Sequence, residues 1–385
     1  MSAEDERRSM SAEDGSVLLT GATGFVGMEV LARYLERGRR RVVALVRAPS
    51  DSAARDRIGA VLENLFGDRA DRYDDRVSAV AGELTEPRLG LSEKRAAELA
   101  EQVGSIVHSA ASVSFVLPLD EAREINVEGT RRMLEFAELA QERGGLEHYG
   151  HISTAYVAGT HTGRFCERDL DVGQEFRNSY EQSKFEAERL VRSHDWLPFT
   201  IMRPSIVVGD SRSGWTAAFN VLYWPLRAFA RGLFTAVPGI PTAPVDVVSI
   251  DYVADSIHAL CDGECGAGAG ETYHLTAGAD ASTIQEIANA ACRYFKRPLP
   301  KVLSPGEWAA LGGGEAQRSA VEGSRAYFPY FSVGTTFDDT ATRARLEPLG
   351  LTASPLGEYL ERLLDFATRS RWGKRPIARA EAFAG

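Results

Sequence analysis

The sequence lacks any apolar run of the roughly 18 to 20 residues that a membrane-spanning helix needs. The charged first residues also lack the apolar core of a signal peptide. No block of basic residues stands out in a chain whose net charge is -10, which argues against nucleic acid as a partner. We therefore expect a cytoplasmic protein without a membrane span. The apolar segment 217–234 carries Arg227, Arg231 and a proline, so it predicts either a substrate-covering helix or a peripheral membrane contact.

The sequence has few cysteines, and their spacing does not match that of a metal site. The four cysteines, Cys166, Cys261, Cys265 and Cys292, form no Cys-x-x-Cys pair and have no histidine cluster beside them. We expect buried, reduced thiols and no metal site. The opening MSAED recurs at residues 10–14, and we expect residues 1–15 to be a disordered tail.

Short apolar runs alternate with amphipathic segments from residue 16 to about residue 210. This alternation predicts an α/β protein with a Rossmann-type, doubly wound parallel sheet. The apolar runs lie at 16–20, 41–46, 76–82, 105–110, 148–153 and 199–209, and the helix-like stretches lie near 26–37, 92–101, 119–142 and 179–194.

The alternation breaks after about residue 210, which predicts a smaller, discontinuous C-terminal substrate domain. Within it, residues 243–261 read as a strand and a helix that return to the main sheet. We therefore assign residues 16–210 plus 243–262 to a main domain built on this sheet. Residues 211–242 plus 263–385 form the predicted substrate-binding region.

A glycine-rich turn, TGATGFVG, connects the first predicted strand to the first predicted helix. Gly21, Gly24 and Gly27 would let the backbone approach a pyrophosphate, whose charge free N–H groups and a helix N-terminus would hold. The second strand is followed by Arg47, where many NAD sites place an acidic residue on the ribose. A guanidinium suits the 2'-phosphate of NADP, so NADPH is favoured over NADH. Arg57 is a second candidate, and a surface arginine without a ligand is the alternative for Arg47.

Tyr180 and Lys184 are one helical turn apart in the segment NSYEQSK. Their spacing fits a proton-delivery pair, and it equally fits two polar neighbours on a helix face. Only five lysines occur in the chain, and the pair needs its context to be interpreted.

Five motifs together resemble the extended short-chain dehydrogenase/reductases over about residues 16–260. They are TGATGFVG, HSAA (108–111), HISTAYVAG (151–159), YEQSK (180–184) and RPSIVVG (203–209). The resemblance implies that Tyr180 donates a proton to the substrate oxygen, that Lys184 lowers the pKa of this phenol and holds the nicotinamide ribose, and that Thr154 adds a hydrogen bond. Ser153 is the alternative to Thr154.

The same resemblance implies a set of further positions. Asn126 would brace the active-site strands through its amide, and the alternative is an asparagine on a helix surface. His108 and His151 lie inside apolar strands, so from their position we expect satisfied core histidines rather than catalysts. The expected cofactor-binding residues are Gly21, Thr23, Gly24, Phe25, Val26, Gly27, Arg47, Arg57, Glu83, Leu84, Ser109, Ala110, Ala111, Tyr180, Lys184, Pro204, Ser205 and Ile206.

Within that superfamily the chain most resembles the thioester reductase and fatty acyl-CoA reductase branch, known for male-sterility-type NAD-binding domains. The similar segments are 82–93, 108–135, 180–191, 245–257 and, more loosely, 327–340. Glu83 stands where the branch usually has Asp, which keeps a carboxylate near the adenine.

The resemblance implies an NADPH-dependent reductase of an acyl-CoA or acyl-carrier thioester, giving an aldehyde and, with a second reduction, an alcohol. The acyl chain, the carrier, the final product and the oligomeric state stay open. An alternative is an NAD(P)-dependent epimerase, dehydratase or carbonyl reductase acting on a nucleotide sugar or another small substrate. A third is an NADP-binding regulatory or scaffold protein without turnover.

Overall fold

The computed structural model describes most of the chain, and residues 1–14 of the predicted N-terminal tail and Cys265 lie outside the described residues. The described ranges are 15–219, 221–233, 236–262, 269–304, 306–307 and 326–384.

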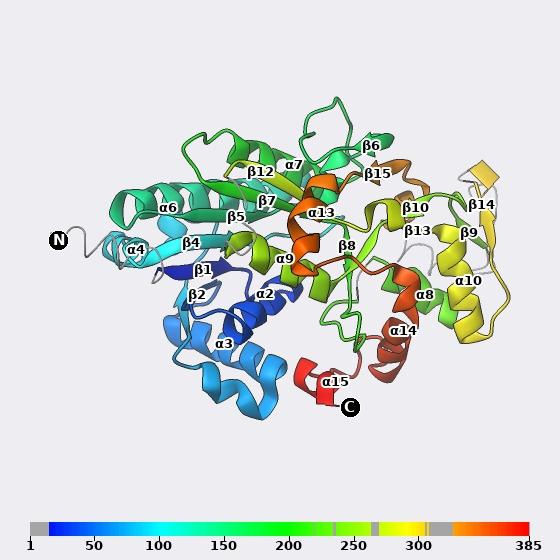
Figure 1. The fold of residues 1–385 in the computed structure, drawn as a ribbon, viewed down its shortest axis with the longest axis horizontal. Helices are drawn as coiled ribbons and strands as arrows, with labels where there is room; N and C mark the ends of the chain where they lie inside the picture. The colour runs from blue at the N-terminus through cyan, green and yellow to red at the C-terminus, as the bar shows by residue number, and fades with distance from the viewer. Residues whose placement is uncertain are drawn as a thin grey trace.

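A seven-stranded, wholly parallel sheet forms the centre of the fold, with the order β12-β7-β5-β4-β1-β2-β3 (Figure 1). Five of its strands, β1, β2, β4, β5 and β7, are almost entirely buried, as expected for apolar runs covered on both faces. The predicted α/β, Rossmann-type fold is therefore confirmed. The strands are β1 (Ser16–Thr20), β2 (Val42–Val46), β3 (Val77–Ala81), β4 (Val103–His108), β5 (His148–Ile152), β7 (Phe199–Pro204) and β12 (Glu271–Leu275).

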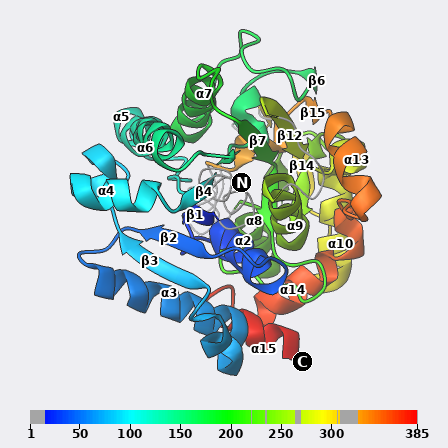
Figure 2. The same ribbon diagram turned by 60° about the vertical axis from the view of Figure 1, so that its left-hand side comes forward.

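Helices cover both faces of the sheet (Figure 2). Residues of α2, α3 and α9 share one hydrophobic core with the sheet, and residues of α4, α6 and α7 share the core on the other face. The α7 helix begins where the Asn178 side chain accepts a hydrogen bond from the Glu181 N–H, so this cap positions Tyr180 and Lys184 in the first turns. These helices are α2 (Phe25–Glu36), α3 (Asp51–Phe66), α4 (Glu93–Ala100), α5 (Leu119–Arg123), α6 (Gly129–Arg143), α7 (Ser179–Arg192) and α9 (Ile250–Cys261).

Three elements differ from the sequence-based expectation. The run 199–209 is two strands, because the chain leaves the central sheet at Ser205 and continues as β8 (Ile206–Val208). The β11 strand (Val247–Ser249) pairs with β8 in a separate two-stranded sheet, so the strand of the segment 243–261 does not join the main sheet, although its α9 helix packs on it. The β12 strand joins the main sheet from within residues 263–385, which we had assigned to the substrate region. The division into two domains stays a prediction.

A second hydrophobic core lies beyond the sheet and combines α8, α10 and α14 with loops around the strand ends. Short two-stranded sheets hold this part together. Its elements are β6 (Gly163–Phe165), α8 (Tyr223–Ala230), β9 (Ala236–Pro238), β10 (Pro244–Val245), β13 (Ser282–Thr283), α10 (Ile284–Phe295), β14 (Lys301–Leu303), β15 (Thr335–Phe337) and α14 (Leu360–Arg369). The helices α13 (Thr340–Leu346) and α15 (Arg379–Ala384) instead pack on the core that contains α2, α3 and α9.

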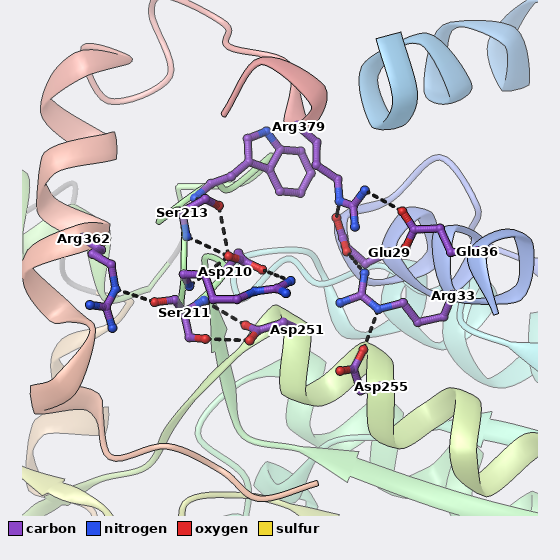
Figure 3. A network of polar contacts seen from close by, with 12 residues as sticks. Glu29, Arg33, Glu36, Asp210, Ser211, Ser213, Asp251, Asp255, Arg362 and Arg379 are labelled. Carbon is purple, nitrogen blue, oxygen red and sulfur yellow. Dashed lines mark hydrogen bonds and ion pairs between the residues drawn. The ribbon is translucent and has the colours of Figure 1, made fainter. Parts of the chain in front are cut away.

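The C-terminal α15 helix returns to the first helix of the nucleotide-binding half. Figure 3 shows Arg379 directed at Glu29 and Glu36 of α2, with an Arg379 Nε to Glu29 Oε1 distance of 2.7 Å. Arg33 pairs with the same Glu29 and reaches Asp255 of α9 at 2.6 Å. Because Glu29 and Arg33 are only 2% exposed, this ion-pair network links three helices through buried charges.

Candidate active site

A cleft of about 720 Å³ lies at the carboxyl ends of the central strands. Open parallel sheets bind ligands at this edge. All of the predicted site residues line the cleft, although their location alone does not establish their roles. They are Gly21, Thr23, Gly24, Phe25, Val26, Gly27, Arg47, Arg57, Glu83, Leu84, Ser109, Ala110, Ala111, Thr154, Tyr180, Lys184, Pro204, Ser205 and Ile206.

The glycine-rich turn at one end of the cleft fits a dinucleotide. Gly21 has a φ of +75°, and a Cβ there would lie 2.8 Å from the Ala110 nitrogen. A Cβ on Gly27 would lie 2.1 Å from the Gly21 carbonyl oxygen, so the turn excludes side chains at both positions. Gly24 caps α2 without a side-chain hydrogen bond, and α2 has no acidic residue in its first turn. The helix N-terminus is therefore free to bind an anion such as a pyrophosphate.

Two exposed arginines lie beyond this turn, at the end of the cleft expected to hold adenosine. Arg57 donates through Nη1 to the Arg47 carbonyl and through Nη2 to the Thr23 hydroxyl at 3.3 Å. Neither guanidinium has an ion-pair partner among the described residues. Glu83 and Leu84 line the same end after β3.

Thr154, Tyr180 and Lys184 come together where β5 ends and α7 begins. The Thr154 hydroxyl donates to the Pro204 carbonyl and accepts from the Tyr156 N–H, both at 3.3 Å. Burial raises the pKa of Tyr180 to about 12, an effect that the Thr154 hydrogen bond opposes and Glu181 reinforces. Tyr180 therefore stays protonated at neutral pH, as a proton donor must. The pKa lowering expected from Lys184 is not among the causes of this shift.

Lys184 is 4% exposed, and its ammonium donates to the Ile152 carbonyl at 2.7 Å. Burial lowers the pKa of Lys184 to about 8, and Glu188 one turn further along α7 opposes this shift. Glu188 is itself held by Arg203 and accepts a hydrogen bond from the Ser153 hydroxyl at 2.7 Å. Because Ser153 is engaged with Glu188, Thr154 is the better placed of the two candidate hydroxyls.

Asn126 lies in a π-helical segment, Glu124–Glu128, between α5 and α6. Its amide accepts from the Ser112 N–H at 2.7 Å and donates to the Ser112 carbonyl and to the Ser183 hydroxyl. We expect Asn126 to brace the active-site strands. In the structure its side chain links the loop after β4 to the α7 helix. Such π-helical insertions are frequent at functional sites.

Neither strand histidine lines the cleft. His108 is hydrogen-bonded to Thr20 at 2.9 Å and to Thr130, and burial, with Lys184 nearby, lowers its pKa to about 3. His151 is fully buried, and neither ring nitrogen has a hydrogen-bond partner among the described residues, so it is not the satisfied histidine that we expected. Burial holds the pKa of His151 well below its ordinary value, so both rings are neutral.

The cysteines also differ in part from expectation. Cys261 is buried, whereas Cys166 and Cys292 are only half-buried. In the described part of the chain, no group of His, Cys, Asp and Glu side chains could hold a metal ion. The same part contains no helix long and apolar enough to cross a membrane.

Sequence reasoning missed an aromatic group at the other end of the cleft. Phe115, Tyr156, Tyr327 and Tyr330 all line it. Phe115 follows the HSAA motif by only a few residues and Tyr156 follows Thr154 by two, so proximity to a motif was an available signal for these two. The other two come from the C-terminal segment, and no local pattern links them to the site.

The fold, the glycine-rich turn and the Thr-Tyr-Lys arrangement together define an oxidoreductase of the extended short-chain dehydrogenase/reductase class with a nicotinamide cofactor. A profile of the NAD-binding family described as "Male sterility protein" matches residues 19–257, more than half of the chain. The chain belongs to this family.

Similar proteins agree with this assignment. An isonitrile lipopeptide synthase of Streptomyces coeruleorubidus is 38% identical over 55% of this chain and 14% of its own length. A putative fatty acyl-CoA reductase of Drosophila melanogaster is 28% identical over 63% of this chain and 50% of its own length. The crystal structure of the terminal R domain from the myxalamid PKS-NRPS biosynthetic pathway has a TM-score of 0.81 and 26% identity, with 98% of this chain and 100% of that one covered. The chain thus spans half or less of these curated relatives.

Proposed function

We propose that this protein reduces an acyl thioester to an aldehyde and a free thiol with NADPH. The observation that carries the proposal is the placement of Thr154, Tyr180 and Lys184 in one cleft with the glycine-rich turn. The similarity to a fatty acyl-CoA reductase and to a terminal R domain supports a thioester as the substrate.

A nicotinamide bound in this cleft would supply the hydride that reduces the carbonyl carbon of the thioester. Tyr180 donates its proton to the carbonyl oxygen, and Thr154 hydrogen-bonds the same oxygen as its negative charge develops. Lys184, charged below pH about 8, would hold the nicotinamide ribose. The resulting hemithioacetal collapses to the aldehyde as the carbon–sulfur bond breaks and the thiolate leaves with a proton.

The preference for NADPH rests on Arg47 and Arg57. Two guanidinium groups without a carboxylate partner among the described residues favour a 2'-phosphate, whereas NADH would offer them only a hydroxyl. We therefore propose NADPH as the working cofactor.

The thioester carrier is either coenzyme A or an acyl-carrier protein. The match to 14% of a lipopeptide synthase supports delivery by a carrier, and the fatty acyl-CoA reductase supports coenzyme A. Reduction onward to the alcohol and a cytoplasmic location are further predictions of the same proposal.

The test is turnover by Tyr180→Phe, which keeps the ring and removes the donor. We expect loss of NADPH oxidation by about a hundredfold or more, with NADPH affinity unchanged in a direct binding titration. Full activity in the variant would refute Tyr180 as the acid. Copurified, tightly held NAD without net NADPH consumption would instead support an epimerase or dehydratase.

A further inference from the structure

Two aromatic rings, Phe115 and Tyr330, form a stack with the ring of the proposed proton donor, Tyr180. The Phe115 ring lies 5.6 Å from the Tyr180 ring and 5.3 Å from the Tyr330 ring, with interplanar angles of 29° and 26°. Tyr156 meets Tyr330 edge-on at 4.9 Å, and Tyr327 contacts Phe115 at 5.6 Å. Phe115 is thus held between the catalytic helix and the C-terminal segment.

Tyr330 is fixed in place by polar contacts that the proposed reaction does not use. Its hydroxyl donates to Glu181 at 2.6 Å and accepts from the Asn178 amide at 2.9 Å. Glu181 is fully buried and is also paired with Arg177 at 3.3 Å. A buried carboxylate with these partners fixes Tyr330 relative to the first turn of α7, where Tyr180 lies. Tyr330 therefore forms a rigid backing for Phe115.

Charge is distributed unevenly along the cleft. The ionised side chains that line it in the described part of the chain are Arg47, Arg57 and Glu83 at the adenosine end and Lys184 in the catalytic set. Val113, Phe115, Ala218, Val221 and the tyrosines also line the cleft. None of these side chains is charged at neutral pH, so among the described residues this part of the lining offers an ammonium or carboxylate no ion-pair partner to replace its water.

We propose that Phe115, backed by Tyr330, is the wall against which an uncharged, apolar acyl group packs beside Tyr180, and that it sets the acyl specificity of the enzyme. This inference rests on the proposed thioester reduction. It adds that the acyl group is apolar along its length and that Phe115 is a specificity-determining residue.

The test compares dodecanoyl-CoA with acetyl-CoA and succinyl-CoA in wild type and Phe115→Ala. We expect the KM for dodecanoyl-CoA to rise about tenfold in the variant, because a long chain loses its apolar contact. The KM for acetyl-CoA and the affinity for NADPH should not change, and succinyl-CoA should be a poor substrate for both proteins. Tyr330→Phe, which keeps the ring and loses its anchor, should give a smaller rise.

Val116→Ala is the matched control, because Val116 lies in the same loop, is 79% exposed and does not line the cleft. An equal loss with all thioesters, or a lower KM for dodecanoyl-CoA, would overturn the inference. Binding of dodecanoyl-CoA, measured by calorimetry, tests this inference separately from the proposed function because it requires no turnover. Weaker binding only in the Phe115 and Tyr330 variants supports the wall even without turnover, and unchanged binding contradicts it.

Discussion

We expect the buried Lys184 ammonium to lower the free energy of unfolding of the protein. Burial lowers its pKa from 10.5 to about 8, so folding disfavours the charged form. Since one pH unit of pKa difference corresponds to about 1.4 kcal/mol, holding the ammonium in the fold costs about 3 kcal/mol at pH 7. The cost is fully present below pH 8 and disappears as the pH rises past 10.5, where both states are neutral. Lys184→Met removes this cost and also the hydrogen bond to Ile152, worth about 1 kcal/mol.

We therefore expect Lys184→Met to be about 2 kcal/mol more stable than wild type at pH 7, with the difference shrinking toward pH 10. Urea unfolding without added nicotinamide measures this directly. Turnover should fall by about a hundredfold or more, as expected where function and stability oppose each other. The control is Lys94→Met, whose side chain is 87% exposed and whose stability should not change appreciably. A destabilised Lys184→Met protein that retains turnover would refute the reasoning.

Three further predictions concern the cofactor site and the C-terminal helix. Gly27→Ala should abolish NADPH binding in a fluorescence titration, because the added Cβ would collide with backbone, whereas Gly59→Ala meets nothing within 4 Å and should bind normally. The double variant Arg47→Ser with Arg57→Ser should raise the KM for NADPH about tenfold or more and leave that for NADH unchanged. Arg379→Ala should lower the free energy of unfolding by about 1 to 3 kcal/mol, because it removes one partner of a buried carboxylate, as thermal or urea unfolding can measure.

For each of these three predictions, one experimental result would contradict the reasoning. Normal NADPH binding by Gly27→Ala would mean that the turn does not hold the pyrophosphate. A parallel loss of NADPH and NADH use in the arginine double variant would remove the basis for cofactor preference. An Arg379→Ala protein as stable as wild type would show that the ion-pair network in Figure 3 adds no net stability.

The elements that could be predicted from the sequence are those in which one short segment carries both the pattern and the chemistry. The glycine-rich turn follows a buried strand directly, and the Tyr180 and Lys184 pair sits within one helical turn, so position along the chain implied position in space. The β12 strand was missed because it is short and partly polar, and only its pairing with β7 makes it a sheet edge. The break at Ser205 likewise depends on β8 pairing with β11 rather than on any turn signal.

The aromatic wall could not be predicted for the same physical reason. Tyr330 is hydrogen-bonded to Glu181, which lies 149 positions earlier in the sequence. The Tyr330 ring also stacks on Phe115, which comes from a third segment. No periodicity within either segment encodes that contact, because it depends on how the C-terminal part folds back over the sheet. The polar partners of Tyr330 became visible only with the structure.

The central claim is tested most directly by incubating the full chain with NADPH and dodecanoyl-CoA while following NADPH oxidation and trapping the products. The account predicts one dodecanal and one free coenzyme A thiol for each NADPH consumed, or dodecanol when a second NADPH is used. Failure of both this thioester and a dodecanoyl-carrier protein to support NADPH oxidation, with NADPH bound, would contradict it.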